Sequence, residues 1–191
     1  MDQINLSEYY KTNHYSDFLE CSRNLIYRSG MKQFIENYEV LVSKDFTEKN
    51  NSPDTSMKLM NELINNVDEF NFFIIRLSIG LEMALKGLFL YHQYNIFVIE
   101  DEKLIKIESL KCDLTTKKTL KFDFFINNLK NIKDSFLEYQ RMFKFFQQRR
   151  NEYIHFAKNK YSYSHKEIVG NIIKLNNFMK NEVFSVLEAE E

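Results

Sequence analysis

Glycine and proline are scarce in this chain, and their scarcity constrains the fold more than any other feature. The 191 residues include 4 glycines and 1 proline. All-β proteins need many tight turns and dinucleotide-binding α/β folds need glycine-rich loops, so both classes are disfavoured. Apolar residues make up 44% of the chain and aromatic residues 15%, which argues against disorder. The composition therefore predicts long helices in a chain large enough to bury a core without disulfide bonds.

The spacing of apolar residues divides the chain into helices. Apolar stripes with a helical period predict helices over about residues 16–28, 31–42, 57–97, 120–129, 135–159 and 164–187. Residues 72–90 are apolar on most faces and should form the most buried helix. The stretch 98–119 lacks a helical period, so we expect an irregular connection in which 103–107 would be able to form a short strand. We predict one all-α domain, a bundle of five to seven helices, with residues 1–56 as an N-terminal helical extension and 57–187 as the core.

The cysteines and the N-terminal residues indicate an intracellular protein. Cys21 and Cys112 are too few for a disulfide framework and lack the spacing of a metal site, so we expect two buried thiols in a reducing cytosol. The N-terminal residues do not resemble a signal peptide. The longest apolar-rich run, 87–99, is too short to cross a bilayer. We expect a cytoplasmic protein that has no membrane contact and uses no metal or other cofactor.

A basic segment lies late in the predicted helix 135–159. Between Arg141 and Lys160 the chain has six basic residues and one acidic residue, Glu152, although the net charge of the whole protein is −1. Such a local excess of positive charge favours contact with a polyanion such as RNA. An exposed Phe145 would be able to stack an unpaired base. The predicted RNA contacts are Lys144, Lys158, Lys160 and Tyr153.

Within this segment, Arg150, Asn151 and His155 suit RNA cleavage without a metal. On an ideal helix Asn151 and His155 lie roughly 40° apart, whereas Arg150 lies roughly 140° from His155 and would reach it with its long side chain. Cleavage through the ribose 2′-OH needs a proton acceptor, a proton donor and a fixed positive charge at the phosphate. Histidine serves the proton transfers, arginine supplies the charge, and Asn151 would orient the histidine or bind a phosphate oxygen. Arg149 fits the spacing to His155 as well, and we prefer Arg150 because Asn151 follows it.

Three segments resemble the HEPN domain family. Arg150-Asn151-x-x-x-His155 matches its signature, an arginine and a polar residue followed by a histidine after four to six intervening residues. Residues 79–89 resemble the early core helix of the family, which often has an acidic residue facing the active-site helix, and Glu82 occupies this place. Residues 119–122 resemble the start of the helix before the motif helix, so the resemblance extends from residue 69 to residue 180.

The resemblance implies both an architecture and an activity. It implies a homodimer in which Arg150 and His155 of both subunits share one composite active site. The implied activity is metal-independent RNA cleavage that leaves 2′,3′-cyclic phosphate and 5′-hydroxyl ends, in a toxin or antiviral defence effector with an antitoxin or another defence protein as partner. Some members lack catalysis, so a non-catalytic helical dimer acting as an adaptor or regulatory protein is the alternative. In one toxin branch of the family, a tyrosine stands two residues after the histidine, and a partner nucleotidyltransferase modifies it. This chain has Ala157 at that position, which puts this route of neutralisation in doubt.

Simpler interpretations exist for several of these residues. Glu82 is able to pair with Lys86 along its own helix, or to support Arg150 from a second helix. His155 would also suit a hydrogen-bonded core position. Glu152 and His155 form one Glu-x-x-His half of a di-iron motif, but the chain has no second half.

Overall fold

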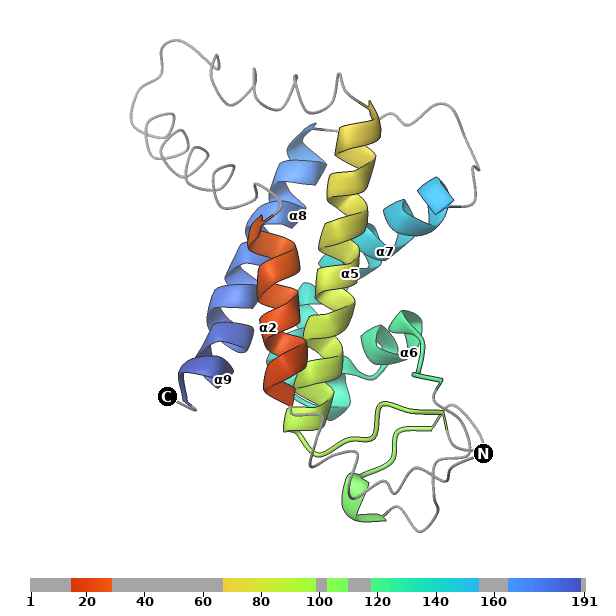
Figure 1. Ribbon diagram of the computed structural model, residues 1–191, viewed down its shortest axis with the longest axis vertical. Helices are drawn as coiled ribbons and strands as arrows, with labels where there is room; N and C mark the ends of the chain where they lie inside the picture. Colours follow the sequence, from red (N-terminus) through yellow and green to blue (C-terminus); the bar gives the residue numbers. More distant parts are fainter. Residues whose placement is uncertain (1–14, 29–66, 99–102, 110–117, 155–164, 190–191) are drawn as a thin grey trace.

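The fold is all-α, as the sequence predicts. The computed structural model describes residues 15–28, 67–98, 103–109, 118–154 and 165–189 (Figure 1). Its α-helices are α2 (Tyr15–Ile26), α5 (Val67–Tyr91), α6 (Phe122–Asn127), α7 (Gln140–Ile154), α8 (His165–Phe178) and α9 (Ser185–Glu188). Short 3-10 helices span Ile107–Ser109, Leu129–Asn131 and Asp134–Tyr139, and a π-helical segment spans Met179–Phe184. The predicted helix 31–42 lies outside the described residues.

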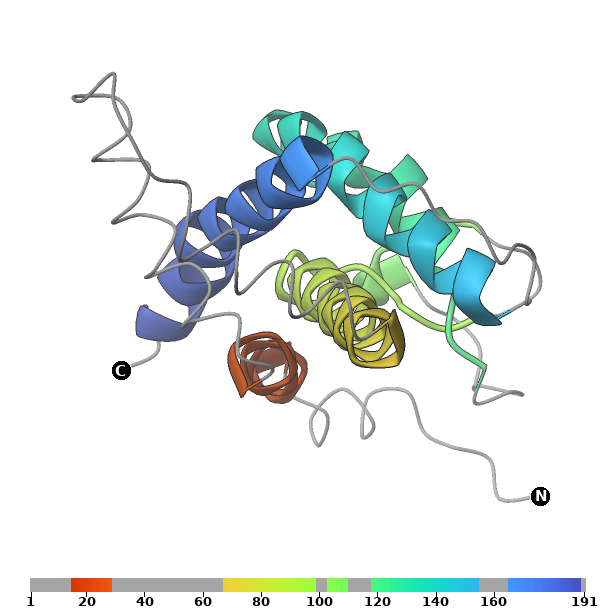
Figure 2. The ribbon, with the colours of Figure 1, turned by 90° about the horizontal axis from the view of Figure 1, so that it is seen from above.

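Helix α5 occupies the centre of the bundle. Seen from above, it lies between α2 on one side and the pair α7 and α8 on the other (Figure 2). Leu77, Leu81 and Leu85 on this helix are completely buried. Buried residues occur on most sides of α5, which agrees with its predicted place at the core.

Two glycines let α2 approach α5 closely. A Cβ atom added to Gly80 would lie 2.6 Å from Cγ1 of Ile26, and one added to Gly87 would lie 2.6 Å from Cδ2 of Leu19. Real atoms do not pack this closely in a protein interior. The missing side chains at these two positions therefore set the spacing between the two helices.

Aromatic rings fill the space between α5, α6, α7 and α8. The ring of Phe143 meets that of Phe178 edge-on with 4.9 Å between centroids, and Phe89 meets Phe125 in the same way at 4.8 Å. Edge-to-face contacts at such distances are favourable beyond the area they bury.

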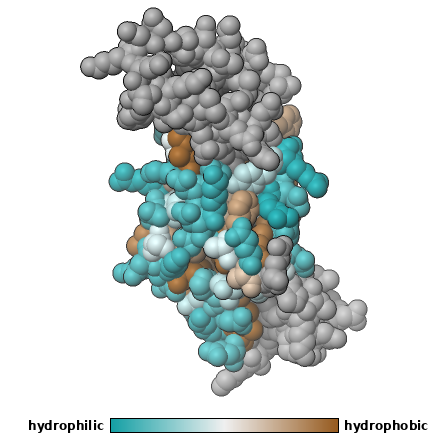
Figure 3. All heavy atoms as spheres, turned by 90° about the vertical axis from the view of Figure 1, so that its left-hand side faces the viewer, coloured by the Kyte–Doolittle hydropathy of each residue, from teal (hydrophilic) through white to brown (hydrophobic). Residues whose placement is uncertain are grey.

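The side of the molecule shown in Figure 3 is mainly hydrophilic over the described residues.

Helix α5 ends at Tyr91, earlier than the predicted end near residue 97. The backbone N–H of Tyr94 donates to the carbonyl of Phe89, and that of Gln93 to the carbonyl of Leu90, both at 2.8 Å. These two bonds form a Schellman motif, in which the residue after the helix adopts a left-handed conformation. Here that residue is Gln93, with a φ of 63°. Because glycine usually takes this place, the residue types around position 93 do not mark the end of the helix.

The connection after α5 is irregular, as predicted. Among the described residues, pairing between extended segments is limited to two isolated antiparallel bridges, Tyr94 with Lys106 and Phe97 with Thr119. Of the short strand considered for 103–107, only the bridge at Lys106 forms. Between the two bridges, the buried side chain of Asn95 bonds to the backbone of Phe97: its amide donates to the carbonyl at 2.6 Å, and its oxygen accepts from the N–H at 3.1 Å.

Two further predictions need correction. The helix predicted to start at residue 135 begins as a 3-10 helix and becomes α-helical only at Gln140. Cys21 is exposed rather than buried, because it lies roughly 200° around α2 from the buried Leu19. Cys112 lies outside the described residues.

No helix in the described part of the chain is long and apolar enough to cross a membrane.

Candidate active site

Arg150 of α7 and Glu82 of α5 meet at the contact between the two helices. Nη1 of Arg150 donates to Oε2 of Glu82 at 2.8 Å. Nζ of Lys86 lies 2.9 Å from Oε1 of the same carboxylate. One carboxylate therefore holds two cations, one through each oxygen, so Glu82 makes both of the contacts considered for it. We name these three residues the Glu82 triad.

The Glu82 triad is largely withdrawn from water and has a net charge of +1. The side chains of Lys86, Glu82 and Arg150 are 7%, 17% and 21% exposed. Burial of the Glu82 carboxyl raises its pKa, but the hydrogen bonds and charges of Lys86 and Arg150 outweigh burial and lower the pKa below its ordinary value. Glu82 is therefore ionised at neutral pH, and it neutralises only one of the two cations.

The remaining surroundings of Arg150 leave donors for a ligand. Cζ of its guanidinium lies 5.8 Å from the centroid of the Phe122 ring. Its buried Nε has no hydrogen-bond partner among the residues that the structure describes. Of the five N–H donors of an arginine, Glu82 takes one and the buried Nε–H is closed to a ligand, so three N–H groups on the two Nη atoms are left for an anion such as phosphate.

Arg149, the alternative arginine, is held by its own helix. Its Nη1 lies 2.9 Å from Oε2 of Glu152. Its Cζ lies 5.3 Å from the ring centroid of Phe145. Geometry thus separates the two arginines: Arg149 makes these contacts within α7, whereas Arg150 is tied to the central helix.

Phe145 is not available for stacking a base. It is 7% exposed and packs edge-on against Phe146 with 5.2 Å between the ring centroids. Its ring lies beneath Arg149. The expectation that Phe145 presents a free ring to a base is therefore wrong.

The other predicted site residues are divided between the surface of α7 and the chain beyond it. Lys144 and Asn151 are exposed on α7. Helix α7 is described as far as Ile154. The residues that lie outside the described part of the chain are His155, Lys158 and Lys160, together with the side chain of Tyr153.

Sequence reasoning missed one polar contact near the triad. Nε2 of Gln147 donates to Oδ1 of Asp123 at 2.6 Å and so joins α7 to α6. Gln147 is 7% exposed. It follows the core residue Phe143 by four positions, and this helical register was the signal that it faces inward. The contact helps to fix the orientation of the helix that presents Arg150.

The described residues contain no group of three His, Cys, Asp or Glu side chains that would hold a metal ion. Glu152, the first residue of the half-motif for iron, is paired with Arg149.

Comparison of the chain with protein-family models, with curated proteins and with solved structures yields no significant match.

Proposed function

We propose that this protein is a metal-independent endoribonuclease of the HEPN type. The observation that supports it most is the Glu82 triad, which holds Arg150 near the end of α7, shortly before His155, with one positive charge uncompensated. A guanidinium in this state suits a phosphate, because charge-assisted hydrogen bonds to phosphate oxygens are strong. Asn151, the next residue, and Lys144 are exposed on the same helix and add polar side chains to its surface.

The proposed reaction needs two proton transfers and one stabilising charge. One imidazole accepts the proton of a ribose 2′-OH, and the 2′-oxygen attacks the neighbouring phosphorus. The bond from phosphorus to the 5′-oxygen breaks, and a second imidazole protonates that oxygen. The products are a 2′,3′-cyclic phosphate and a 5′-hydroxyl. In a homodimer the two imidazoles are His155 and the partner's His155, and Arg150 stabilises the added negative charge on the phosphate.

The supporting roles follow from the same proposal. Glu82 positions Arg150, and Arg149 lies beside it on α7. Contacts to the RNA chain are assigned to Lys144, Lys158, Lys160 and Tyr153. A protein of this activity would be a toxin or defence effector in the cytoplasm, controlled by an antitoxin or another defence protein.

Cleavage of mixed cellular RNA in excess EDTA tests the proposal. The parent protein is compared with His155→Ala, with Arg150→Ala and with Lys174→Ala, which changes an exposed lysine on α8. We expect the parent and Lys174→Ala to cut RNA, and the other two variants to lose about 100-fold or more in rate, the usual size of a lost acid–base group for His155 and of a lost charge-stabilising donor for Arg150. Cutting by His155→Ala at the parent rate would refute the mechanism.

A non-catalytic helical dimer that acts as an adaptor is the second candidate. The same ion pair favours it, because a buried contact between Arg150 and Glu82 also serves to join α7 to α5. A stable dimer that leaves RNA intact under all conditions of the cleavage assay would point to this function.

A further inference from the structure

The exposed side of α7 consists of polar residues only between positions 141 and 151. The exposed side chains in this interval are Arg141, Lys144, Gln148 and Asn151. They follow one another at spacings of three or four residues, so they form a single line along the helix. The apolar residues of the interval, from Met142 to Phe146, are buried. We name the line of four exposed residues the α7 polar stripe.

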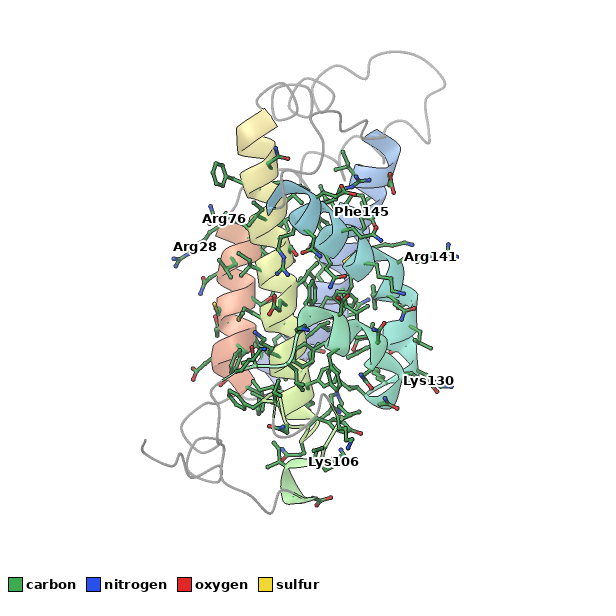
Figure 4. The ribbon with its side chains drawn as sticks, turned by 90° about the vertical axis from the view of Figure 1, so that its right-hand side faces the viewer. Arg28, Arg76, Lys106, Lys130, Arg141 and Phe145 are labelled. Carbon is green, nitrogen blue, oxygen red and sulfur yellow. The ribbon has the colours of Figure 1, made fainter. Side chains whose placement is uncertain are left out.

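The α7 polar stripe has positive charge and no exposed acidic side chain within it. Arg141 points away from the bundle (Figure 4), and neither Arg141 nor Lys144 forms an ion pair with any residue that the structure describes. Along the chain, acidic residues stand only at its two ends, and from α6 the exposed Asp123 reaches its flank, where it accepts a hydrogen bond from Gln147. Glu138 precedes it on the 3-10 helix, and Glu152 beyond it is paired with Arg149 at 2.9 Å.

This composition suits a nucleic acid better than a protein. Protein interfaces usually have an apolar or aromatic centre and few lysines, and the α7 polar stripe has no apolar residue. The neighbouring ring, Phe145, is 7% exposed and lies beneath Arg149, so the stripe offers no stacking surface to a base. Cations and amides such as those of Arg141 and Gln148 bind phosphate and sugar oxygens, contacts that do not read the base sequence.

We propose that the α7 polar stripe binds the sugar–phosphate backbone of single-stranded RNA without regard to its sequence. The inference rests on the proposed function, because the stripe ends at Asn151, beside Arg150. At 1.5 Å per residue it spans roughly 15 Å, or about four nucleotides at ~3.4 Å per stacked nucleotide. RNA held at the site therefore continues along α7 toward the 3-10 helix Asp134–Tyr139. The stripe strengthens RNA binding but does not select the cleavage sequence.

The salt dependence of RNA binding tests this inference. The ligands are fluorescein-labelled 12-mers of 2′-O-methyl adenosine and of 2′-O-methyl uridine, which lack the hydroxyl needed for cleavage. Anisotropy gives their affinity for the parent, for Arg141→Gln/Lys144→Gln and for the control Lys130→Gln/Lys174→Gln. The control removes the same charge from exposed residues off the stripe.

We expect the stripe variant to bind both oligomers with a shallower salt dependence. Losing two phosphate contacts lowers the slope of log K against log salt concentration by about 1.4, at ~0.7 per contact on a single strand. If the binding curves converge near 1 M salt, the same slope difference makes binding about 25-fold weaker at 0.1 M. The control variant should keep the parent slope.

Three results would overturn the inference. These are an unchanged slope in the stripe variant, an equal loss in the control, and an effect limited to one of the two base sequences. Cleavage of unmodified RNA, measured separately, distinguishes this failure from that of the proposed function. If the stripe variant shows the expected loss of slope but the parent never cleaves RNA, only the nuclease proposal is refuted. If the parent cleaves RNA but the stripe variant keeps the parent's slope, only the proposed role of the stripe is refuted.

Discussion

Replacing Glu82 with glutamine should destabilise the protein substantially, because the substitution leaves two cations facing each other in a poorly hydrated place. Lys86 is 7% exposed and Arg150 is 21% exposed, and Glu82 contacts both at 2.8–2.9 Å. Breaking a buried ion pair by removing one partner costs about 3–5 kcal/mol. The lower end of this range applies here, since glutamine still accepts hydrogen bonds and Arg150 is able to turn toward water. For a domain of this size, about 3 kcal/mol lowers Tm by roughly 6–12 °C.

Differential scanning calorimetry of Glu82→Gln beside the parent measures this change. The double variant Glu82→Gln/Lys86→Met serves as the matched control, because it removes the carboxylate together with the more buried of the two cations. We expect the double variant to regain about half or more of the lost Tm, as residues in one network are not additive. A Tm drop below about 2 °C in Glu82→Gln would refute the reasoning, since it would place the interaction in the range of a surface ion pair.

Three further predictions concern pH and backbone geometry. Burial and two neighbouring lysines lower the pKa of His92, so the folded protein binds its proton less readily than the unfolded chain. Stability should therefore fall as pH drops below about 6.5, and His92→Gln should weaken this part of the pH dependence in urea titrations. Gln93→Gly should raise the free energy of unfolding by about 0.5–1 kcal/mol, because glycine adopts the left-handed conformation without strain, and an unchanged urea midpoint would argue against the Schellman motif. Gly80→Ala should cost about 1–3 kcal/mol, because the added Cβ would clash with Ile26, and native stability in this variant would show that α2 lies further from α5.

The helices could be predicted from the sequence more reliably than their ends. Apolar residues at helical spacing located α2 and α8, because each has to bury one side, and a run that is apolar on most sides located the central helix α5. The end of α5 depends on Gln93, whose left-handed conformation is imposed by the fold around it rather than preferred by glutamine. The 3-10 helix before Gln140 buries Phe136 and Tyr139, whose three-residue spacing fits a 3-10 helix and an α-helix alike, so the pattern in the sequence does not reveal it.

The candidate site was predicted in part. A carboxylate in an apolar helix had to find a cation, and the family resemblance pointed from Glu82 toward Arg150. That one carboxylate holds Lys86 and Arg150 at once is a tertiary property, which no spacing within a single helix encodes. Residue type misled on exposure at Phe145 and Cys21: Arg149 lies over the Phe145 ring, and Cys21 lies on the side of α2 away from Leu19.

The central claim is that Arg150 and His155 act on a phosphate next to a ribose 2′-OH. Two mixed-sequence 20-mers, one of RNA and one fully 2′-O-methylated, are incubated with excess EDTA and the parent protein, and the ends of any products are identified by mass spectrometry. We expect only the RNA to be cut, its fragments to end in a 2′,3′-cyclic phosphate and begin with a 5′-hydroxyl, and His155→Ala to yield no fragments. Cutting of the methylated strand, or fragments with 5′-phosphate ends, would contradict this claim.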